Sequence, residues 1–192
     1  MRLPIRILAA AALLAGLLIA LILAEDRARA QGEEAVLAME AVDPRNLLTG
    51  HYVAIDLVHR LPAGEPCPAG LPQPPGRGWL ALSKAADGRH ILSGGGAMRA
   101  EAQAAGDIAV RGSAHCFRLG DGAEAQTAVR LEIGVDRFHA DQAEAERIEA
   151  LLRRRLGAEP VEAAAVVSVG RDGRARLKGI VLDGRRLDLN WW

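Results

Sequence analysis

The chain has 192 residues, which is enough for one modest domain after any leader segment. Its 24 basic and 24 acidic side chains leave no formal net charge, which excludes a bulk electrostatic attraction to nucleic acid or anionic lipid. Aromatic side chains make up only 3% of the chain, so nucleic-acid bases would find few platforms on which to stack. We therefore expect no nucleic-acid partner.

The first recognisable element is a hydrophobic segment that follows positive charge. Arg2 and Arg6 precede an uninterrupted apolar run, Ile7–Ala24, of about 18 residues, which is near the lower limit for crossing a bilayer. Because Arg6 can reach the lipid headgroups, residues 3–24 are predicted to form an anchor in the lipid bilayer, with 1–24 as the anchor region. Basic flanks favour the cytoplasm, which predicts a cytoplasmic N-terminus and a C-terminal part on the other side of the membrane.

A cleaved signal peptide is the alternative interpretation of this segment. Ala28-Arg29-Ala30 offers a small-x-small cleavage site before Gln31. However, the apolar run is longer than the usual signal core of ~7–15 residues, and the site lies behind the charged residues 25–27. These two features favour an anchor that is not cleaved after Ala30.

After the anchor, residues 25–42 are polar and rich in Ala, and we interpret them as a juxtamembrane spacer before an extracytoplasmic domain of residues 43–192. Alternating apolar residues and tight-turn dipeptides predict antiparallel strands in that domain. The expected strands are residues 51–58, 79–84, 90–93, 108–119, 127–135, 163–169, 174–182 and 185–191. Proline and glycine predict a long irregular loop over 60–78, and Gly94–Gly96 is expected to be a flexible connection.

One amphipathic helix is expected at about residues 141–156. Asp141 and Glu144 have the spacing of a capping box, and Gly157 and Pro160 suit the end of a helix. Apolar residues recur between them at helical intervals, namely Ile148, Leu151, Leu152 and Leu156. The chain is therefore predicted to have an α+β fold, with a single N-terminal transmembrane helix and a mainly antiparallel β-rich domain on whose sheet the amphipathic helix packs.

The stretch from residue 43 to residue 57 resembles a known family motif. Asp43, Pro44 and Arg45 precede a motif that falls on Gly50, His51, Tyr52, Val53, Ala54, Ile55, Asp56 and Leu57. Together with the segments 131–141 (LEIGVDRFHAD) and 167–184 (VSVGRDGRARLKGIVLDG), in the same order, this motif makes the chain similar to the GDYXXLXY proteins. That resemblance covers nearly the whole chain and implies an uncharacterised bacterial membrane-anchored protein with no established activity. With the orientation expected from the basic flank, it implies a bacterial inner-membrane protein with a cytoplasmic N-terminus and a periplasmic C-terminal domain.

The chain departs from the family pattern at three positions. His51 replaces an Asp, Ile55 replaces a Leu, and Leu57 replaces the final Tyr. The last two substitutions keep the character of a strand, whereas the first removes a negative charge. Because any chemistry of that carboxylate would be lost here, we interpret the motif as structural. In this interpretation Gly50 permits a tight turn into the strand and Tyr52 anchors it.

Cys67 and Cys116 are the only cysteines in the chain. An even number of cysteines in an exported domain favours a disulfide, and a proline-rich loop gains stability from being tied down. Two unpaired thiols, one of them in a mobile loop, are the alternative. A redox site is not expected, because the chain has no Cys-x-x-Cys motif.

The remaining polar residues give no strong sign of a cofactor or of catalysis. The histidines lack the spacing of metal ligands, and they are His51, His59, His90, His115 and His139. Ser83 and Lys84 suggest a Ser/Lys hydrolase, but adjacent residues on a strand point to opposite faces. Gly94–Gly96 is not followed by the Lys-Ser/Thr of a phosphate loop, and Arg153–Arg155 fits the C-terminal end of a helix.

These observations predict a membrane-anchored envelope protein that binds or assembles with another envelope component and is not an enzyme. An exported hydrolase is the main alternative, and it would need a polar pocket with a nucleophile and a base. A carrier of lipid or another small ligand is a further alternative, and it would need an apolar cavity between sheet and helix. No cofactor is expected, and the sequence does not identify the partner.

Overall fold

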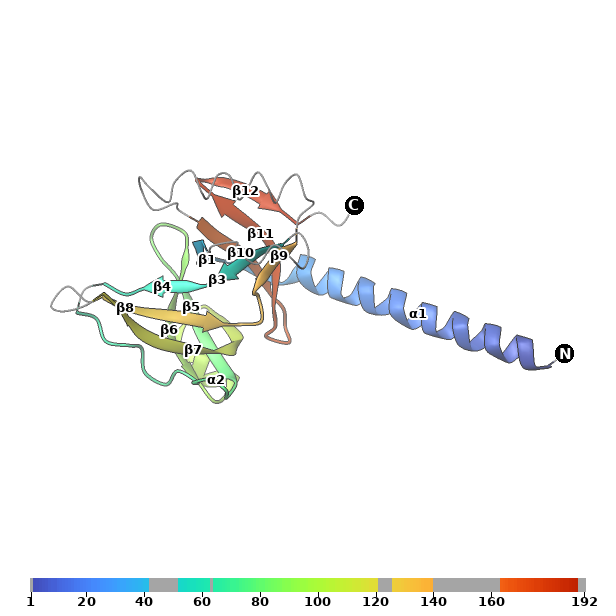
Figure 1. The fold of residues 1–192 in the computed structure, drawn as a ribbon. Helices are drawn as coiled ribbons and strands as arrows, with labels where there is room; N and C mark the ends of the chain where they lie inside the picture. The colour runs from blue at the N-terminus through green and yellow to red at the C-terminus, as the bar shows by residue number, and fades with distance from the viewer. Residues whose placement is uncertain (1, 42–51, 63, 121–125, 140–162, 190–192) are drawn as a thin grey trace.

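The computed structural model describes residues 2–41, 52–62, 64–120, 126–139 and 163–189. The fold is α+β, as the sequence predicts, with a long apolar N-terminal helix, a large and mostly antiparallel sheet and one more short helix (Figure 1). Within the described residues, the helices are α1 (Arg2–Gln31) and α2 (Arg99–Ala105). The strands are β1 (Glu33–Ala38), β2 (Glu40–Ala41), β3 (Tyr52–Asp56), β4 (Val58–Arg60), β5 (Gly78–Lys84), β6 (His90–Gly96), β7 (Ile108–Leu119), β8 (Gln126–Glu132), β9 (Arg137–His139), β10 (Ala163–Val169), β11 (Ala175–Leu182) and β12 (Arg185–Asp188).

The helix α1 projects away from the folded domain for most of its length (Figure 1). Its apolar side chains are exposed along this part, and Leu23, close to the domain, still has 54% of its surface exposed. The helix is long and apolar enough to cross a membrane. These exposed apolar side chains are consistent with a membrane anchor, in which lipid would cover them.

Within the spacer expected at residues 25–42, the described residues 25–41 do not form a separate segment. Helix α1 continues to Gln31, and after Gly32 the chain enters β1 and then β2. The strand β1 buries Ala35 and Leu37 on one face, but its Ala-rich sequence gives only a weak alternation of apolar and polar residues. The folded domain therefore begins directly at the end of the anchor helix.

The main sheet of the described residues has nine strands in the order β12-β11-β10-β1-β6-β5-β7-β8-β4. Its neighbouring strands are antiparallel except for β1 and β6, which meet in parallel at one pair of residues, Leu37 and His90. This short pairing divides the sheet into two halves. We call α1, β1 and β10–β12 the anchor half, and β4–β8 with α2 and the loop 61–77 the stapled half.

One hydrophobic core joins the two halves. Leu37 and Ile180 of the anchor half pack in the same cluster as Leu80, Leu82 and Val110 of the stapled half, and each is 0–1% exposed. Burial of one such side chain contributes about 1.5–3 kcal/mol. The shared core, more than the single β1–β6 pairing, therefore holds the halves together.

The strand expected at residues 51–58 is divided in the structure. Strand β3 pairs with β2 and β9 in a small three-stranded sheet, whereas β4 pairs with β8 at the edge of the main sheet. Leu57 lies at the division and is 1% exposed, so burial of this side chain accompanies the change of sheet. The other expected strands are present within the described residues, with small shifts at their ends.

Gly94–Gly96 is not the flexible connection expected from the sequence, because it forms the second part of β6. At Gly95 a methyl group would lie 2.8 Å from the Trp79 carbonyl oxygen and 3.1 Å from Cδ of Pro72. Pro72 belongs to the proline-rich loop, which crosses the sheet at this point. The glycines therefore serve close packing, since a side chain would push the loop away from the sheet.

The short helix α2 is an element that sequence reasoning missed. It packs against β5, β6 and β7 and buries Ala102 completely. At its start the Glu101 carboxylate accepts a hydrogen bond of 3.1 Å from the Met98 backbone N–H, without a Ser, Thr, Asp or Asn at the preceding position. The helix expected at about 141–156, and its packing on the sheet, lie outside the described residues.

Candidate functional site at the anchor junction

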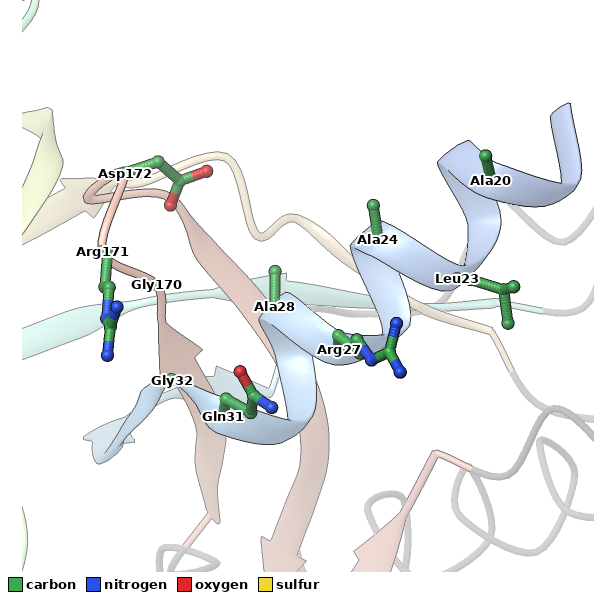
Figure 2. Close-up of a pocket in the computed structure, with 10 residues that line it drawn as sticks. All are labelled: Ala20, Leu23, Ala24, Arg27, Ala28, Gln31, Gly32, Gly170, Arg171 and Asp172. Carbon is green, nitrogen blue, oxygen red and sulfur yellow. The ribbon is translucent and has the colours of Figure 1, made fainter. Parts of the chain in front are cut away.

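A pocket lies where the end of α1 meets the turn between β10 and β11 (Figure 2). Its volume is about 650 Å³. The residues that line it are Ala20, Leu23, Ala24, Arg27, Ala28, Gln31, Gly32, Gly170, Arg171 and Asp172. The pocket therefore connects the last turns of the apolar run to a polar turn of the domain.

Small side chains form one wall of this pocket. Ala20, Ala24 and Ala28 are spaced four residues apart, so they point to the same side of α1, as Figure 2 shows. Asp172 lies on the turn that faces this side of the helix (Figure 2). The short methyl groups leave open space between the helix and the turn, where larger side chains would fill it.

Gly32 allows the helix to end close against the sheet. A methyl group on this residue would overlap the Ser168 side chain and would lie 2.9 Å from the backbone of Val169. Both of these residues belong to β10, whose neighbour in the sheet is β1. Gly32 therefore permits α1 to pass directly into β1 with no room for an intervening linker.

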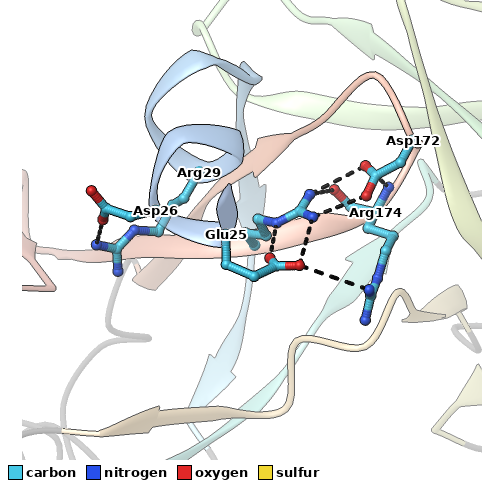
Figure 3. A network of polar contacts seen from close by, with 6 residues as sticks. Glu25, Asp26, Arg29, Asp172 and Arg174 are labelled. Atoms are coloured by element: carbon cyan, nitrogen blue, oxygen red, sulfur yellow. Dashed lines mark hydrogen bonds and ion pairs between the residues drawn. The ribbon is translucent and has the colours of Figure 1, made fainter. Parts of the chain in front are cut away.

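Ion pairs fix the end of α1 to the β10–β11 turn (Figure 3). The Arg176 guanidinium donates hydrogen bonds to the Glu25 carboxylate at 2.6 and 3.3 Å, and to the Asp172 carboxylate at 2.9 and 3.2 Å. Arg174 adds a longer contact of 4.0 Å to Glu25. Arg176 is 13% exposed, whereas Glu25 is 49% exposed. One largely enclosed cation, that of Arg176, thus bridges the anchor helix and the domain.

A second group of ion pairs ties β1 to the C-terminal strands of the anchor half. The Glu34 carboxylate accepts hydrogen bonds from Lys178 at 3.0 Å and from Arg186 at 2.7 Å. The bond from Arg186 is the main reason why the pKa of Glu34 falls from 4.5 to about 2. In the same way, the bond from Arg176 lowers the pKa of Asp172 from 3.8 to about 2. Both carboxylates are therefore charged at neutral pH.

The other side of the turn packs against Trp79 and two arginines. Arg99 and Arg111 each place their guanidinium carbon over the Trp79 ring, at 5.3 and 5.0 Å from its centroid. Arg99 also donates a hydrogen bond of 2.7 Å to the Arg171 carbonyl oxygen, and the Arg111 N–H donates to the Gly173 carbonyl oxygen at 2.7 Å. The turn is thus held between the anchor helix and the stapled half.

Cys67 and Cys116 form the disulfide that the sequence predicts, with their Cα atoms 6.3 Å apart. The bridge joins the proline-rich loop to β7. In the same loop, the Pro72 carbonyl oxygen accepts a hydrogen bond of 2.9 Å from the Ala114 N–H, and Leu71 packs against the core. The cysteines therefore act as a structural staple within the stapled half and lie away from the pocket at the anchor junction.

The family-motif residues that the structure describes lie in strands or in the core, or make a contact within the fold. Ile55 and Leu57 are buried at 7% and 1% exposure, and Asp56 between them accepts a two-pronged hydrogen bond from Arg130 at 2.8 Å. Tyr52 begins β3, where it pairs with His139 of β9. Val53 and Ala54 continue β3. Five further residues of the motif and its approach lie outside the described residues, namely Asp43, Pro44, Arg45, Gly50 and His51.

The structure does not bring the described histidines together. No group of three or more His, Cys, Asp or Glu side chains suited to a metal ion occurs within the described ranges. His90 accepts a hydrogen bond of 3.2 Å at Nδ1 from the Val36 N–H, and burial lowers its pKa because the charged form loses hydration. Ser83 donates its hydroxyl hydrogen bond to Ser93 at 3.0 Å. These contacts support structural roles for both residues.

Sequence reasoning missed the residues of the anchor junction. Glu25 and Arg176 lie 151 positions apart in the chain, so no local spacing connects them. The available signals were an acid directly after the apolar run and an Arg-Asp-Gly turn in the terminal hairpin. The Asp-Gly dipeptide predicts a turn between the strands expected at 163–169 and 174–182. The contact of this turn with the anchor helix, however, depends on the fold of the whole sheet.

The fold and the junction define an α+β protein whose single N-terminal apolar helix, long enough for a membrane anchor, continues directly into its domain. The family model described as "GDYXXLXY protein" matches residues 14–180, which is most of the chain. The protein therefore belongs to the GDYXXLXY family, as the resemblance seen in the sequence predicts. No curated protein and no solved structure matches the chain.

Proposed function

We propose that this protein is a non-enzymatic, membrane-anchored envelope protein whose domain binds or assembles with another envelope component. The observation that carries this proposal is the direct passage of α1 into β1, secured by the Glu25–Arg176 ion pair. A domain that needs only to be tethered would function on a flexible linker. A domain joined rigidly to its anchor presents its surface at a fixed position, which suits assembly with a neighbour in the same membrane.

We place the protein in a bacterial inner membrane, with the N-terminus in the cytoplasm and the domain in the periplasm. The basic residues Arg2 and Arg6 before the apolar run support this orientation. The Cys67–Cys116 disulfide supports it independently, because disulfides persist in oxidising compartments. A reporter that is active only outside the cytoplasm, fused after residue 192, should be active, and an inactive but intact fusion would contradict this orientation.

Binding of a partner can be tested by photocrosslinking in intact cells. Met98 is the most exposed large apolar side chain of the described residues outside α1, at 62%. A photoreactive amino acid at this position should give a discrete adduct that mass spectrometry identifies as one other envelope protein. The matched control carries the same amino acid at Met98 but has α1 replaced by a cleavable signal sequence, and it should lose the adduct.

Two results would contradict the proposal. An adduct that forms equally well with the released domain would show that the fixed position on the membrane does not matter. Turnover of an ester, peptide or glycan by the purified full chain would instead favour the exported-hydrolase alternative.

A further inference from the structure

The pocket at the anchor junction extends across the level of the membrane surface. The apolar run from Ile7 to Ala24 is about 27 Å long as a helix, close to the ~30 Å thickness of the hydrocarbon core. The pocket is lined on α1 from Ala20 to Gln31, so one end would lie beside the acyl chains and the other beside the headgroups. A membrane lipid is therefore the molecule that neighbours this opening.

The polar end of the pocket carries positive charge that the protein does not neutralise. Arg27 and Arg171 line the pocket, and within the described part of the chain neither guanidinium has an ion pair or a hydrogen bond. The one acidic residue in the lining, Asp172, is already paired with Arg176 at 2.9 Å. An anion is thus the complementary group for this end of the pocket.

More positive charge surrounds the same turn. Arg99 and Arg111 lie over Trp79, and neither has a carboxylate partner among the described residues. Arg99 reaches the backbone of Arg171, which links the two sets of arginines. This local excess contrasts with the zero net charge of the whole chain. Basic residues beside a membrane attract anionic lipids within about one Debye length of the surface.

We propose that this pocket binds an anionic phospholipid of the leaflet that faces the domain. The lipid phosphate would lie beside Arg27 at the polar end of the pocket, and Arg171, which points elsewhere from the turn (Figure 2), would add to the attraction from the domain side. One acyl chain would follow the alanine wall formed by Ala20 and Ala24. Arginine suits this role because its planar group donates several hydrogen bonds to one phosphate. The proposal depends on α1 lying in a membrane, but it requires no protein partner and therefore goes beyond the proposed function.

The test is lipid binding to the purified full chain, measured by native mass spectrometry from a neutral detergent. Phosphatidylglycerol and phosphatidylcholine with identical acyl chains are titrated separately. The wild-type chain should bind phosphatidylglycerol more tightly. In Arg27→Gln/Arg171→Gln this affinity should fall roughly tenfold or more, with little change for phosphatidylcholine, because each basic residue adds to attraction of the anionic lipid only.

Two further variants separate this site from general charge effects. Arg118→Gln/Arg185→Gln removes two exposed arginines of β7 and β12 that do not line the pocket, and it should keep the wild-type preference. Arg27→Lys/Arg171→Lys keeps both charges and should retain most of the preference for phosphatidylglycerol. Equal affinity of the wild-type chain for both lipids, or the same loss in the Arg118/Arg185 variant, would overturn the proposal.

Discussion

The loop that carries Cys67 and the turn that carries Asp172 are both irregular segments that lie against the sheet, but different interactions hold them there. The loop is joined covalently to β7 through Cys116 and lies against backbone and glycines of the stapled half. The turn is held by hydrogen-bonded charges, chiefly those of Arg176, in the anchor half. The first interaction is insensitive to salt and pH, whereas the second responds to both.

Each kind of interaction suits the segment that it holds. A loop with several prolines cannot be tied down by a strand ladder, so a covalent bond limits its motion instead. The turn lies beside the anchor helix, and in the proposed membrane orientation its charged groups would be close to both the protein and the lipid headgroups. A treatment that acts on only one kind of interaction should therefore loosen either the loop or the turn, and leave the other in place.

The largest expected effect comes from a residue that both halves share. Leu37→Ala removes a fully buried side chain beside the only parallel pairing of the described sheet, and it should lower the free energy of unfolding by ~2–5 kcal/mol. Chemical denaturation of the full chain in detergent would measure this. Val36→Ala, on the less buried face of β1, is the control and should have a smaller effect. A loss below ~0.5 kcal/mol for Leu37→Ala would show that the core does not join the halves.

Removal of the disulfide should be the next largest perturbation. Cys67→Ser/Cys116→Ser should lower the free energy of unfolding by ~2–4 kcal/mol, because the closed loop no longer restricts the unfolded chain. Addition of a reductant to the wild-type chain should have a similar effect and none on the double variant. Mass spectrometry after alkylation without reductant provides the direct check, since two alkylated cysteines on the folded wild-type protein would rule out the bridge.

Loss of the bridging arginine should have a smaller effect, confined to the anchor half. Arg176→Gln removes the hydrogen bonds to Glu25 and Asp172, and we expect a cost of ~1–2 kcal/mol, limited because both carboxylates are partly exposed. Arg60→Gln, which breaks a more exposed pair with Glu40, is the matched control and should cost less than ~0.5 kcal/mol. Equal costs for the two variants would contradict a special role of the junction.

Acid should weaken the anchor half further, by the smallest amount. The pKa values of Glu34 and Asp172 lie below their ordinary values of 4.5 and 3.8, at about 2. Their stabilising effect is therefore complete above the ordinary values and is lost as the pH falls towards about 2. Denaturation midpoints over this range should fall for the wild-type chain and should change less for Glu34→Gln/Asp172→Asn. An identical pH dependence of the two proteins would contradict these assignments.

Local patterns in the sequence were sufficient for much of the stapled half. Alternation predicted β5 and β7 at nearly their observed ends, and the cysteine count predicted the disulfide. The long apolar run likewise predicted the part of α1 that leaves the domain. The strands and the helix depend on residues that are close in the chain. The disulfide could be predicted because two cysteines allow only one pairing.

The features that were missed depend on contacts between distant residues. Strand β1 has an Ala-rich sequence, and only its place between β10 and β6 makes it a strand. Gly95 belongs to a run of three glycines that is typical of a flexible linker. Only the folded structure shows that Pro72 packs closely against it. The Glu25–Arg176 pair requires the terminal hairpin to lie beside the anchor, which no spacing in the sequence specifies.

Hydrogen–deuterium exchange of the full chain in lipid nanodiscs would test most directly whether the loop that carries Cys67 and the turn that carries Asp172 are held in place by separate interactions. Reduction of the disulfide should increase exchange in residues 64–77 and leave residues 170–176 unchanged, whereas Arg176→Gln should have the reverse effect. The same increase across both segments after either treatment would contradict the account, because it would show that the ion pairs and the disulfide stabilise one indivisible unit.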